Sequence, residues 1–113
     1  MVSGALPAAS QFSIWLVNLD PTIGSEIKKT RPCLIVSPDE MNAWLRTIII
    51  APMTTARKSY ASRVPIHFED KDGEVALDQI RTIDRARLIR RLGRATEPTA
   101  QAVADTLVEM FAR

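Results

Sequence analysis

Two stretches without alternation of apolar and polar side chains, residues 33–36 and 47–51, constrain the fold most strongly. They read Cys-Leu-Ile-Val and Thr-Ile-Ile-Ile-Ala and are rich in the branched side chains that favour strands. A strand that is buried on both faces has this continuous pattern, whereas a half-exposed strand alternates. Pro52 follows the second stretch at once and predicts its end. The chain is therefore expected to contain interior strands.

The rest of the pattern places strands first and one helix last. Residues 14–20 and 64–68 alternate as strands do. Residues 70–73 carry the signal of a hairpin turn and lead into residues 74–77. Residues 80–92 mix apolar side chains with arginines and fit no single element. The expected connections are polar loops at residues 21–30 and 56–62 and one helical turn at residues 38–42.

The last segment predicts an amphipathic helix. Thr96 supplies a capping hydroxyl, Glu97 an acid in the first turn and Pro98 an early proline. Apolar residues then recur at helical spacing at Ala100, Val103, Ala104, Leu107 and Phe111. Five or six short strands and one terminal helix, in a chain of this length, predict a mainly β small barrel with the helix packed against it.

The chain of 113 residues has room for one domain. Residues 1–11, rich in Ala, Ser, Gly and Pro, are expected to form a flexible tail before a single domain at residues 12–113. No apolar stretch is long enough to cross a bilayer, and the tail lacks the features of a signal peptide. A soluble cytoplasmic protein is therefore expected. The lone Cys33 excludes an intramolecular disulfide and is expected to be buried.

Charge is distributed unevenly, although the net charge is only +2. Residues 81–94 contain six arginines and a single acid, and further cations cluster at residues 28–31 and 57–63. The acids gather at residues 39–40 and 69–78. Basic patches on a protein of modest net charge suit a nucleic-acid partner without requiring one.

Several motifs follow one another between residues 14 and 84: Trp-Leu-Val-x-Leu-Asp-Pro, Gly-Ser-Glu, Arg-Pro-x-Leu-Ile-Val, Pro-Met-Thr and Asp-Gln-Ile-Arg-Thr-Ile-Asp. Together, over about residues 14–113, they resemble the MazF/PemK family of type II toxin–antitoxin ribonucleases, which includes Kid-like toxins. The resemblance implies an SH3-like β-barrel of the MazF/Kid/CcdB type with a C-terminal helix. It also implies a homodimeric, sequence-specific endoribonuclease toxin that cleaves single-stranded RNA without a metal or other cofactor. A small acidic antitoxin would neutralise it.

The resemblance also implies site residues. The Arg-Pro motif places the family's catalytic arginine at Arg31, and the Pro-Met-Thr motif places its partner threonine at Thr54. Kid-like members use an arginine and an aspartate around one residue, together with a histidine in the first loop. Of that second set this chain keeps only Asp78, since Ala76 and Ser25 stand at the other two positions. We therefore prefer the set built on Arg31 and Thr54, with Asp78 as a further catalytic candidate.

Cleavage of RNA without a metal uses the 2′-hydroxyl of the substrate as the nucleophile, and charge builds on the phosphate oxygens. Arg31 suits that charge because a guanidinium binds two oxygens at once and an arginine stays positively charged at neutral pH. Thr54 can donate a hydrogen bond to the same phosphate. The 2′ proton needs an acceptor, and either Asp78 or Glu26 could serve if burial raised its pKa toward neutrality.

Further polar residues are candidates for RNA binding: Ser25, Glu26, Lys28, Lys29, Thr55, Gln79 and Arg81. Structural roles compete with these interpretations. Asp78 could cap its turn or pair with Arg81, and Gln79 could stabilise the same turn. Arg81 could instead pair with Asp84. In a two-fold dimer, residues 21–30 of both chains would lie beside one groove, which an acidic antitoxin peptide could cover.

Two other functions are compatible with such a barrel. A toxin resembling CcdB binds DNA gyrase without enzymatic activity and uses a Trp-Gly-Ile carboxyl end, whereas this chain ends in Met-Phe-Ala-Arg. A catalytically inactive relative could still bind the antitoxin. The presence of Arg31, Thr54 and Asp78 favours the endoribonuclease over both alternatives.

Overall fold

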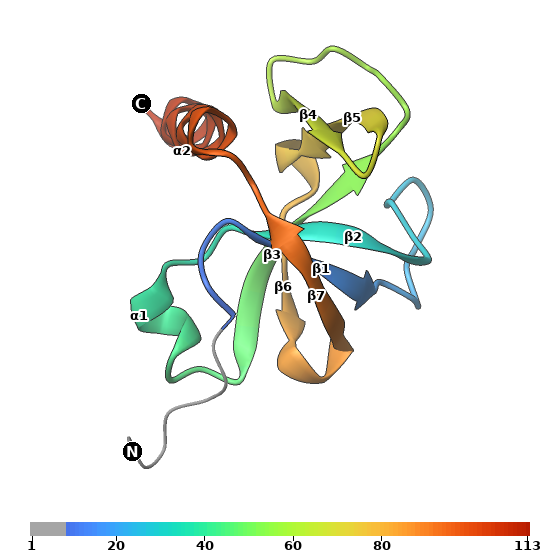
Figure 1. Cartoon of the computed structure of the whole chain (residues 1–113), viewed down its shortest axis with the longest axis vertical. Helices are drawn as coiled ribbons and strands as arrows, with labels where there is room; N and C mark the ends of the chain where they lie inside the picture. Colours follow the sequence, from blue (N-terminus) through green and yellow to red (C-terminus); the bar gives the residue numbers. More distant parts are fainter. Residues whose placement is uncertain (1–8) are drawn as a thin grey trace.

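The computed structural model describes residues 9–113, in which an antiparallel sheet curls around a buried interior and a helix lies beside it (Figure 1). Its elements are β1 (Ser13–Asn18), β2 (Thr30–Ile35), α1 (Asp39–Asn42), β3 (Thr47–Thr54), β4 (Arg63–Phe68), β5 (Lys71–Ala76), β6 (Arg81–Asp84), β7 (Leu88–Arg94) and α2 (Glu97–Phe111). Short 3-10 turns at Leu77–Gln79 and Arg85–Arg87 flank β6. The expected fold, a mainly β barrel-like domain with a C-terminal helix, is confirmed.

Strand β3 organises the sheet because it changes partner along its length. Residues 47–50 pair with β6, residues 50–52 with β2, and residues 53–54 with β5. The other strands extend the sheet to the order β4-β5-β3-β2-β1-β7, with antiparallel neighbours throughout. The end of β3 therefore meets both β2 and the β4–β5 hairpin at one junction.

Pro52 lies inside β3 and does not end it, which corrects the sequence expectation. It is buried and pairs with Cys33 of β2. The carbonyl of Ile49 accepts from the N–H of Val36 on the β2 side, so alternation directs the nitrogen of Pro52 to the opposite side. There β3 has left β6 and has not yet met β5, so no partner strand requires an N–H at this position.

The strand at residues 33–36 is buried on both faces, as its sequence predicts. Leu34 and Val36 belong to one apolar cluster with residues of β4, β5 and α2, whereas Cys33 and Ile35 belong to a second cluster with Val17 of β1. Cys33, Leu34 and Ile35 are fully buried. Apolar packing on both sides therefore fixes the position of β2, whose first residues carry part of the site.

The β4–β5 hairpin turns earlier than the sequence predicts. Phe68 pairs with Lys71, which leaves a two-residue turn at residues 69–70 with positive φ values of 51° and 60°. Positive φ at both residues is the mark of a type I′ turn, whose twist suits an antiparallel hairpin. Gly73, expected in the turn, lies within β5, where a Cβ would come within 2.5 Å of the Thr54 carbonyl oxygen.

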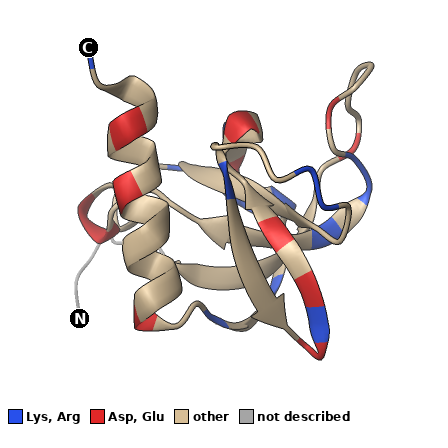
Figure 2. Cartoon of the chain, turned by 90° about the horizontal axis from the view of Figure 1, so that it is seen from above, with Lys and Arg blue, Asp and Glu red and all other residues tan. Residues whose placement is uncertain are grey.

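Helix α2 begins at the expected cap. Thr96 Oγ1 accepts from the N–H of Thr99 at 3.4 Å, and Ala100 and Val103 are buried. Phe111, expected on the same packed face, is 67% exposed. The last turns of α2 project beyond the edge of the sheet, so the apolar face of the helix loses its packing surface there (Figure 2).

Residues 9–11 belong to the folded domain, in contrast to the expected tail through residue 11. Ala9 is buried and its carbonyl accepts from Asn42 Nδ2 at 2.7 Å, and the Gln11 N–H donates to Asp39 Oδ1 at 2.7 Å. The first eight residues of the expected tail lie outside the described residues. None of the described helices is long and apolar enough to cross a membrane.

Residues 80–92 contain β6, a short turn and most of β7. Among the strands of residues 9–113, β7 pairs with β1 alone, and the pairing shifts register between Ile14 and Trp15 and again between Leu16 and Val17. Such irregularities interrupt the alternation of inward and outward side chains. The sequence therefore gives no clear period in this segment.

Candidate active site

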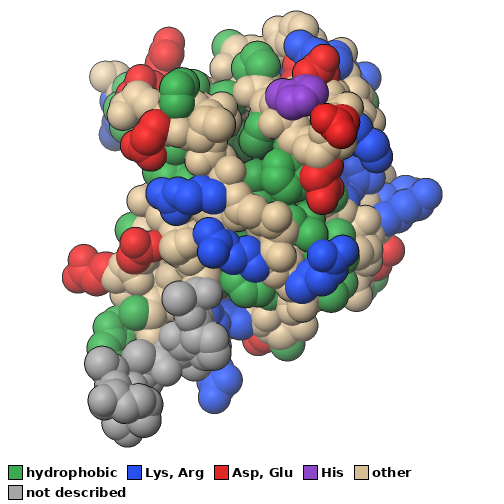
Figure 3. Space-filling view, in the orientation of Figure 1, with side chains coloured by type: hydrophobic (Ala, Val, Ile, Leu, Met, Phe, Trp, Pro, Cys, Tyr) green, Lys and Arg blue, Asp and Glu red, His purple; other side chains and the backbone are tan. Residues whose placement is uncertain are grey.

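A cleft of about 160 Å³ lies where β2, the end of β3 and the β4–β5 hairpin meet. Its polar lining consists of Arg31, Thr54, Thr55, Glu69 and Lys71. Its apolar lining consists of Pro32, Met53, Ile66 and Phe68. Figure 3 shows apolar side chains in the middle of the molecule, between the hairpin that carries the histidine and a group of Lys and Arg side chains. The cleft thus combines cations and hydroxyls with an apolar floor.

Arg31 is half-buried near the start of β2, and backbone carbonyls fix its guanidinium. Its Nε donates to the Lys28 carbonyl at 2.9 Å, and its Nη1 donates to the Met53 carbonyl at 3.5 Å. Continuing the β2–β3 register by two residues places Arg31 opposite Thr54. A guanidinium has five N–H donors, so donors remain for an anion in the cleft.

Thr54 ends β3 at the cleft. Its Oγ1 accepts from the N–H of Ala56 at 3.1 Å, which orients the hydroxyl and leaves its hydrogen for donation to a ligand. Thr55 is exposed and lines the same cleft. The structure therefore brings three of the predicted site residues, Arg31, Thr54 and Thr55, to one place.

A second hollow, of about 400 Å³, gathers most of the other predicted residues. It is lined by Ser25, Glu26, Asp78, Gln79, Ile80 and Arg81. Gln79 Oε1 accepts from the Ile27 N–H at 2.7 Å, and Arg81 Nη2 donates to the Ile27 carbonyl at 3.2 Å. Gln79 and Arg81 therefore fasten the β1–β2 loop to the sheet. Within residues 9–113, Arg81 forms no ion pair with Asp78 or Asp84, which corrects that expectation.

Asp78 is bound by Arg63. Its carboxylate accepts from Arg63 Nε at 2.6 Å and Nη2 at 3.2 Å, and from Ser62 Oγ at 3.0 Å. The hydrogen bonds from Arg63 lower the pKa of Asp78 below its ordinary value, against the opposing effect of partial burial. A carboxylate with a lowered pKa is a poor proton acceptor at neutral pH. The structure therefore disfavours the expected role of Asp78 as a general base.

The β1–β2 loop presents the remaining predicted residues. Glu26 is exposed, and its Oε1 accepts from the Ile23 N–H at 2.7 Å. Lys28 and Lys29 are exposed, and the Lys29 N–H donates to Asp20 Oδ1 at 3.0 Å. Figure 2 shows this loop as a projecting arm with Lys and Arg positions, in blue, at its base. Both lysines thus lie shortly before Arg31 in the chain and face solvent.

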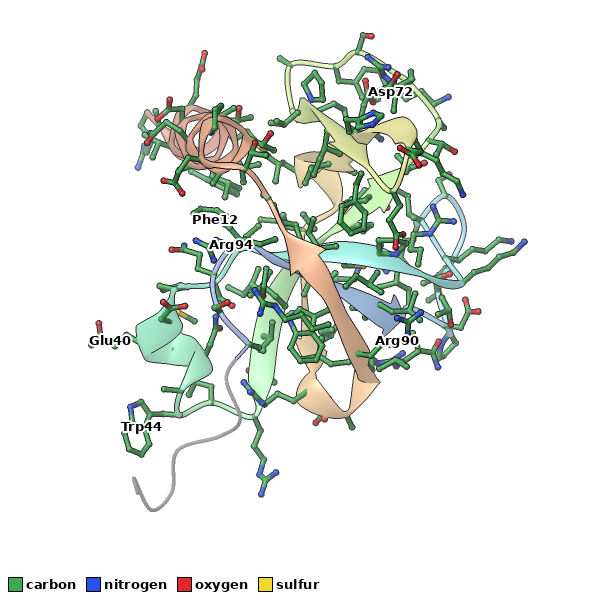
Figure 4. The ribbon with its side chains drawn as sticks, in the orientation of Figure 1. Phe12, Glu40, Trp44, Asp72, Arg90 and Arg94 are labelled. Atoms are coloured by element: carbon green, nitrogen blue, oxygen red, sulfur yellow. The ribbon has the colours of Figure 1, made fainter. Side chains whose placement is uncertain are left out.

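Further cations lie on β7, away from the motifs. Arg90 and Arg94 are exposed on this strand, which crosses the front of the molecule (Figure 4). Arg94 Nη1 donates to the Gln11 carbonyl at 3.1 Å. On β7, Arg90 and Arg91 are therefore solvated, whereas Arg94 fastens the chain segment before β1. Arg85 and Arg87, which precede this strand, also donate to backbone carbonyls.

Sequence reasoning missed the hairpin side of the cleft, which consists of Ile66, Phe68, Glu69, Lys71 and Gly73. Alternation predicts the same face for Phe68 and Ile66, but the meeting of the hairpin with Thr54 follows only from the pairing of β3 with β5. The buried Glu74 was missed as well. Its signal in the sequence is a single acid directly before an apolar run, because a buried charge requires partners.

Among the described residues, no three His, Cys, Asp or Glu side chains lie close enough together to hold a metal ion. The cleft offers guanidinium, ammonium and hydroxyl donors beside a single carboxylate, that of Glu69. This set suits an anion, and a phosphodiester in particular, because guanidinium and hydroxyl groups both donate to phosphate oxygens.

Fold and cleft together define a small barrel-like β-domain with a cleft, lined by cations and hydroxyls, where β2, the end of β3 and the β4–β5 hairpin meet. Residues 10–111 match the family model described as "PemK-like, MazF-like toxin of type II toxin-antitoxin system". The chain therefore belongs to this toxin family.

Known proteins resemble this chain in sequence and in fold. The curated endoribonuclease MazF of Staphylococcus epidermidis is 34% identical over 87 residues, which cover 70% of this chain and 71% of the relative. The solved Mycobacterium tuberculosis toxin MazF-mt6 is 25% identical with a TM-score of 0.75, over 88% of this chain and 95% of that chain. MazF from Deinococcus radiodurans, 24% identical with a TM-score of 0.80, covers 92% and 96%. At 24% identity, the likeness to the Deinococcus radiodurans structure is a likeness of fold alone.

Proposed function

We propose that this chain is the toxin of a type II toxin–antitoxin system and cleaves single-stranded RNA, including mRNA, at a short sequence without a metal. The observation that carries the proposal is the placement of Arg31 and Thr54 on adjacent strand ends beside an apolar floor. Guanidinium and hydroxyl groups bind a phosphate, and an apolar floor accepts the face of a base. Family membership and likeness to a curated endoribonuclease support the same conclusion.

In the proposed reaction, the 2′-oxygen attacks the adjacent phosphorus, and the 5′-oxygen of the next nucleotide leaves. The new bond gives a 2′,3′-cyclic phosphate, and the leaving 5′-oxygen takes up a proton from solvent water. Arg31 stabilises the charge on the non-bridging oxygens, and Thr54 donates to one of them. Because an arginine remains charged at neutral pH, Arg31 acts electrostatically and not as the base.

In this proposal the 2′ proton passes to solvent water, because neither of the two candidate carboxylates is buried beside Arg31 and Thr54. Asp78 is held ionised by Arg63, with a lowered pKa. Glu26 is exposed and lines the second hollow, where its Oε1 accepts from the Ile23 N–H of its own loop. Asp78 then supports the site by fixing the loop that follows Thr54.

The floor of the cleft supports the binding of a base beside the reacting phosphate. Phe68 supplies an aromatic ring, and Ile66 and Met53 extend the apolar surface. Stacking on an aromatic side chain is the usual way in which proteins hold unpaired bases. Lys71 lies at the same cleft, where its ammonium group suits a neighbouring phosphate.

The β1–β2 loop supplies the proposed path of the RNA away from the cleft. Lys28 and Lys29 are suited to phosphates, while Ser25 and Glu26 line the second hollow. Gln79 and Arg81 contribute by fixing this loop through Ile27. The hollow then accepts nucleotides that flank the cleaved bond.

Assembly and location extend the proposal. In a homodimer with two-fold symmetry, two β1–β2 loops would border one groove. A small acidic antitoxin could inhibit the toxin by laying an extended peptide across the lysines of that groove. Because a toxin that cleaves mRNA needs access to its substrate, the cytoplasm is the proposed location.

Primer-extension mapping of a long RNA treated with the purified protein tests the proposal. We expect breaks at one short sequence, unchanged by excess EDTA and absent with Arg31→Ala. The Arg31→Ala protein should keep the unfolding temperature of the wild type and its mass as a dimer in solution. Loss of cleavage in EDTA, or full cleavage by Arg31→Ala, would contradict the mechanism. Inhibition of DNA gyrase without RNA breaks would favour the non-enzymatic alternative.

A further inference from the structure

Glu74 is a carboxylate buried behind the cleft. It lies in the middle of β5, and its side chain is only 2% exposed. Arg63, whose own side chain is 6% exposed, donates to Glu74 Oε1 from Nη1 at 3.3 Å, and Arg57 Nε lies 3.6 Å from Oε2. Glu74 does not line the cleft. Because Glu74 is buried and does not line the cleft, it can act only through the protein groups that it binds.

The two oxygens of Glu74 fasten the β3–β4 loop, residues 55–62, at its middle. Oε1 accepts from the Lys58 N–H and Oε2 from the Ser59 N–H, both at 3.0 Å. Ser59 has a φ of 56°, so the loop makes a tight turn where Glu74 binds it. The end of the same loop is fixed by the bonds of Asp78 to Ser62 and Arg63, and the same Arg63 also donates to Glu74.

The same strand positions the residue from which this loop departs. Glu74 pairs with Thr54 across β3 and β5. At the preceding residue, Gly73, a Cβ would come within 2.5 Å of the Thr54 carbonyl oxygen, so β5 approaches Thr54 more closely than another residue would allow. The hydroxyl of Thr54 accepts from Ala56 in the loop. Its direction therefore depends on the path of a loop that Glu74 fixes.

We propose that Glu74 and Gly73 are positioning residues for the cleavage reaction: Gly73 admits Thr54 against β5, and Glu74 fixes the β3–β4 loop that orients the Thr54 hydroxyl. The proposal rests on the proposed function of the cleft. Glu74 touches no substrate and acts only through Thr54 and its loop. Replacing the carboxylate leaves two backbone N–H groups and a guanidinium short of acceptors, so the loop must move to find others.

A double-mutant cycle between Glu74 and Thr54 tests the proposal. Glu74→Gln keeps the size of the side chain but loses an acceptor and the charge. We expect it to lower kcat for RNA cleavage about 10-fold or more with little change in KM, because the lost contact is made in the transition state. In a Thr54→Val background the same change should cost less than about 3-fold, because residues that act through one contact are not additive.

Asp72→Asn is the matched control. It removes one carboxylate from the same strand, but Asp72 is exposed and pairs with exposed His67. We expect its kcat and KM to equal those of the wild type. Hydrogen exchange gives a readout besides activity: the Lys58 and Ser59 amides should be protected in the wild type and in Asp72→Asn, and should exchange faster in Glu74→Gln.

Ser59→Pro covers the case in which Glu74→Gln does not fold. The change lies in an exposed turn, removes one of the bonds to Glu74, and introduces a residue that cannot adopt the positive φ of this position. We expect the same loss of kcat as in Glu74→Gln. In a Thr54→Val background the loss should again be much smaller. Unchanged kcat, or a loss that multiplies fully with that of Thr54→Val, would overturn the positioning role. Cleavage by the wild type and its loss in Arg31→Ala, measured alongside, separate that result from failure of the proposed function.

Discussion

At the scale of single residues, the site depends on the direction of a few donors. Two backbone carbonyls fix the Arg31 guanidinium before a ligand binds. Groups that are oriented in advance stabilise a transition state without the cost of reorganisation. The direction of the guanidinium should therefore matter as much as its charge.

Arg31→Lys tests that statement. Lysine keeps the positive charge but loses the planar fork and the Nε bond to the Lys28 carbonyl. We expect kcat/KM for cleavage of a fluorogenic oligonucleotide to fall roughly 100-fold. Arg46→Lys, an exposed position just before β3, is the matched control and should have wild-type activity. Near-normal activity of Arg31→Lys would mean that the cleft requires only a positive charge.

Phe68 permits a second test at this scale, directed at the base. Phe68→Ala removes the ring, whereas Phe68→Leu keeps apolar packing against the core cluster but has no aromatic face. A stacked base contributes about 1–3 kcal/mol, so both variants should raise KM about 10-fold. Binding of an RNA carrying 2-aminopurine near the cleaved bond should quench fluorescence in the wild type only. If Phe68→Leu binds and quenches like the wild type, stacking on Phe68 is not used.

At the scale of elements, the β3–β4 loop is fixed by charges. Hydrogen bonds from the Lys58 N–H, the Ser59 N–H and Arg63 lower the pKa of Glu74 below its ordinary 4.5. Hydrogen bonds from Arg63 lower the pKa of Asp78 below its ordinary 3.8. A lowered folded pKa contributes stability that is present above the unfolded pKa and is lost as pH falls through the folded pKa. Acid should therefore weaken the fold through this loop.

The free energy of unfolding, measured with urea, should consequently be nearly constant between about pH 7 and pH 5 and decrease below about pH 4.5. Asp78→Asn removes one of the titrating groups, so the decrease in acid should be smaller in this variant, although it is less stable at neutral pH. Asp105→Asn, an exposed position on α2, should show the wild-type decrease. An identical decrease in Asp78→Asn and the wild type would contradict the contribution of this carboxylate.

The elements also show what a sequence can and cannot predict. The strand at residues 33–36 and the Thr96 cap of α2 are local patterns, and both appear where expected. Pro52 within β3 and Gly73 within β5 depend on which strands lie alongside, which no local pattern contains. Likewise, motif positions identified Arg31 and Thr54, but the partner of Asp78 is Arg63, which lies fifteen residues earlier in the chain.

At the scale of the whole molecule, the basic and apolar surfaces have different proposed tasks. The net charge is only +2, so long-range attraction of RNA must come from local groups of cations. The lysines of the β1–β2 loop lie next to Arg31 in the chain, whereas α2 carries acids and no Lys or Arg (Figure 2). Binding should therefore involve the loop side of the molecule and spare the helix.

The salt dependence of RNA affinity tests this division. With an oligonucleotide made resistant to cleavage by a 2′-deoxy substitution, log affinity should fall linearly with log salt, with a slope of about −0.7 per phosphate contacted. Lys28→Ala and Lys29→Ala should each reduce the slope by about 0.7, because each removes one phosphate contact. Arg46→Ala removes a cation beyond the opposite end of β3, about 25 Å from Thr54 along an extended strand, and should leave the slope unchanged. Equal reductions in all three variants would show that net charge alone attracts the RNA, and a slope near zero would remove phosphate contacts from the proposed binding mode.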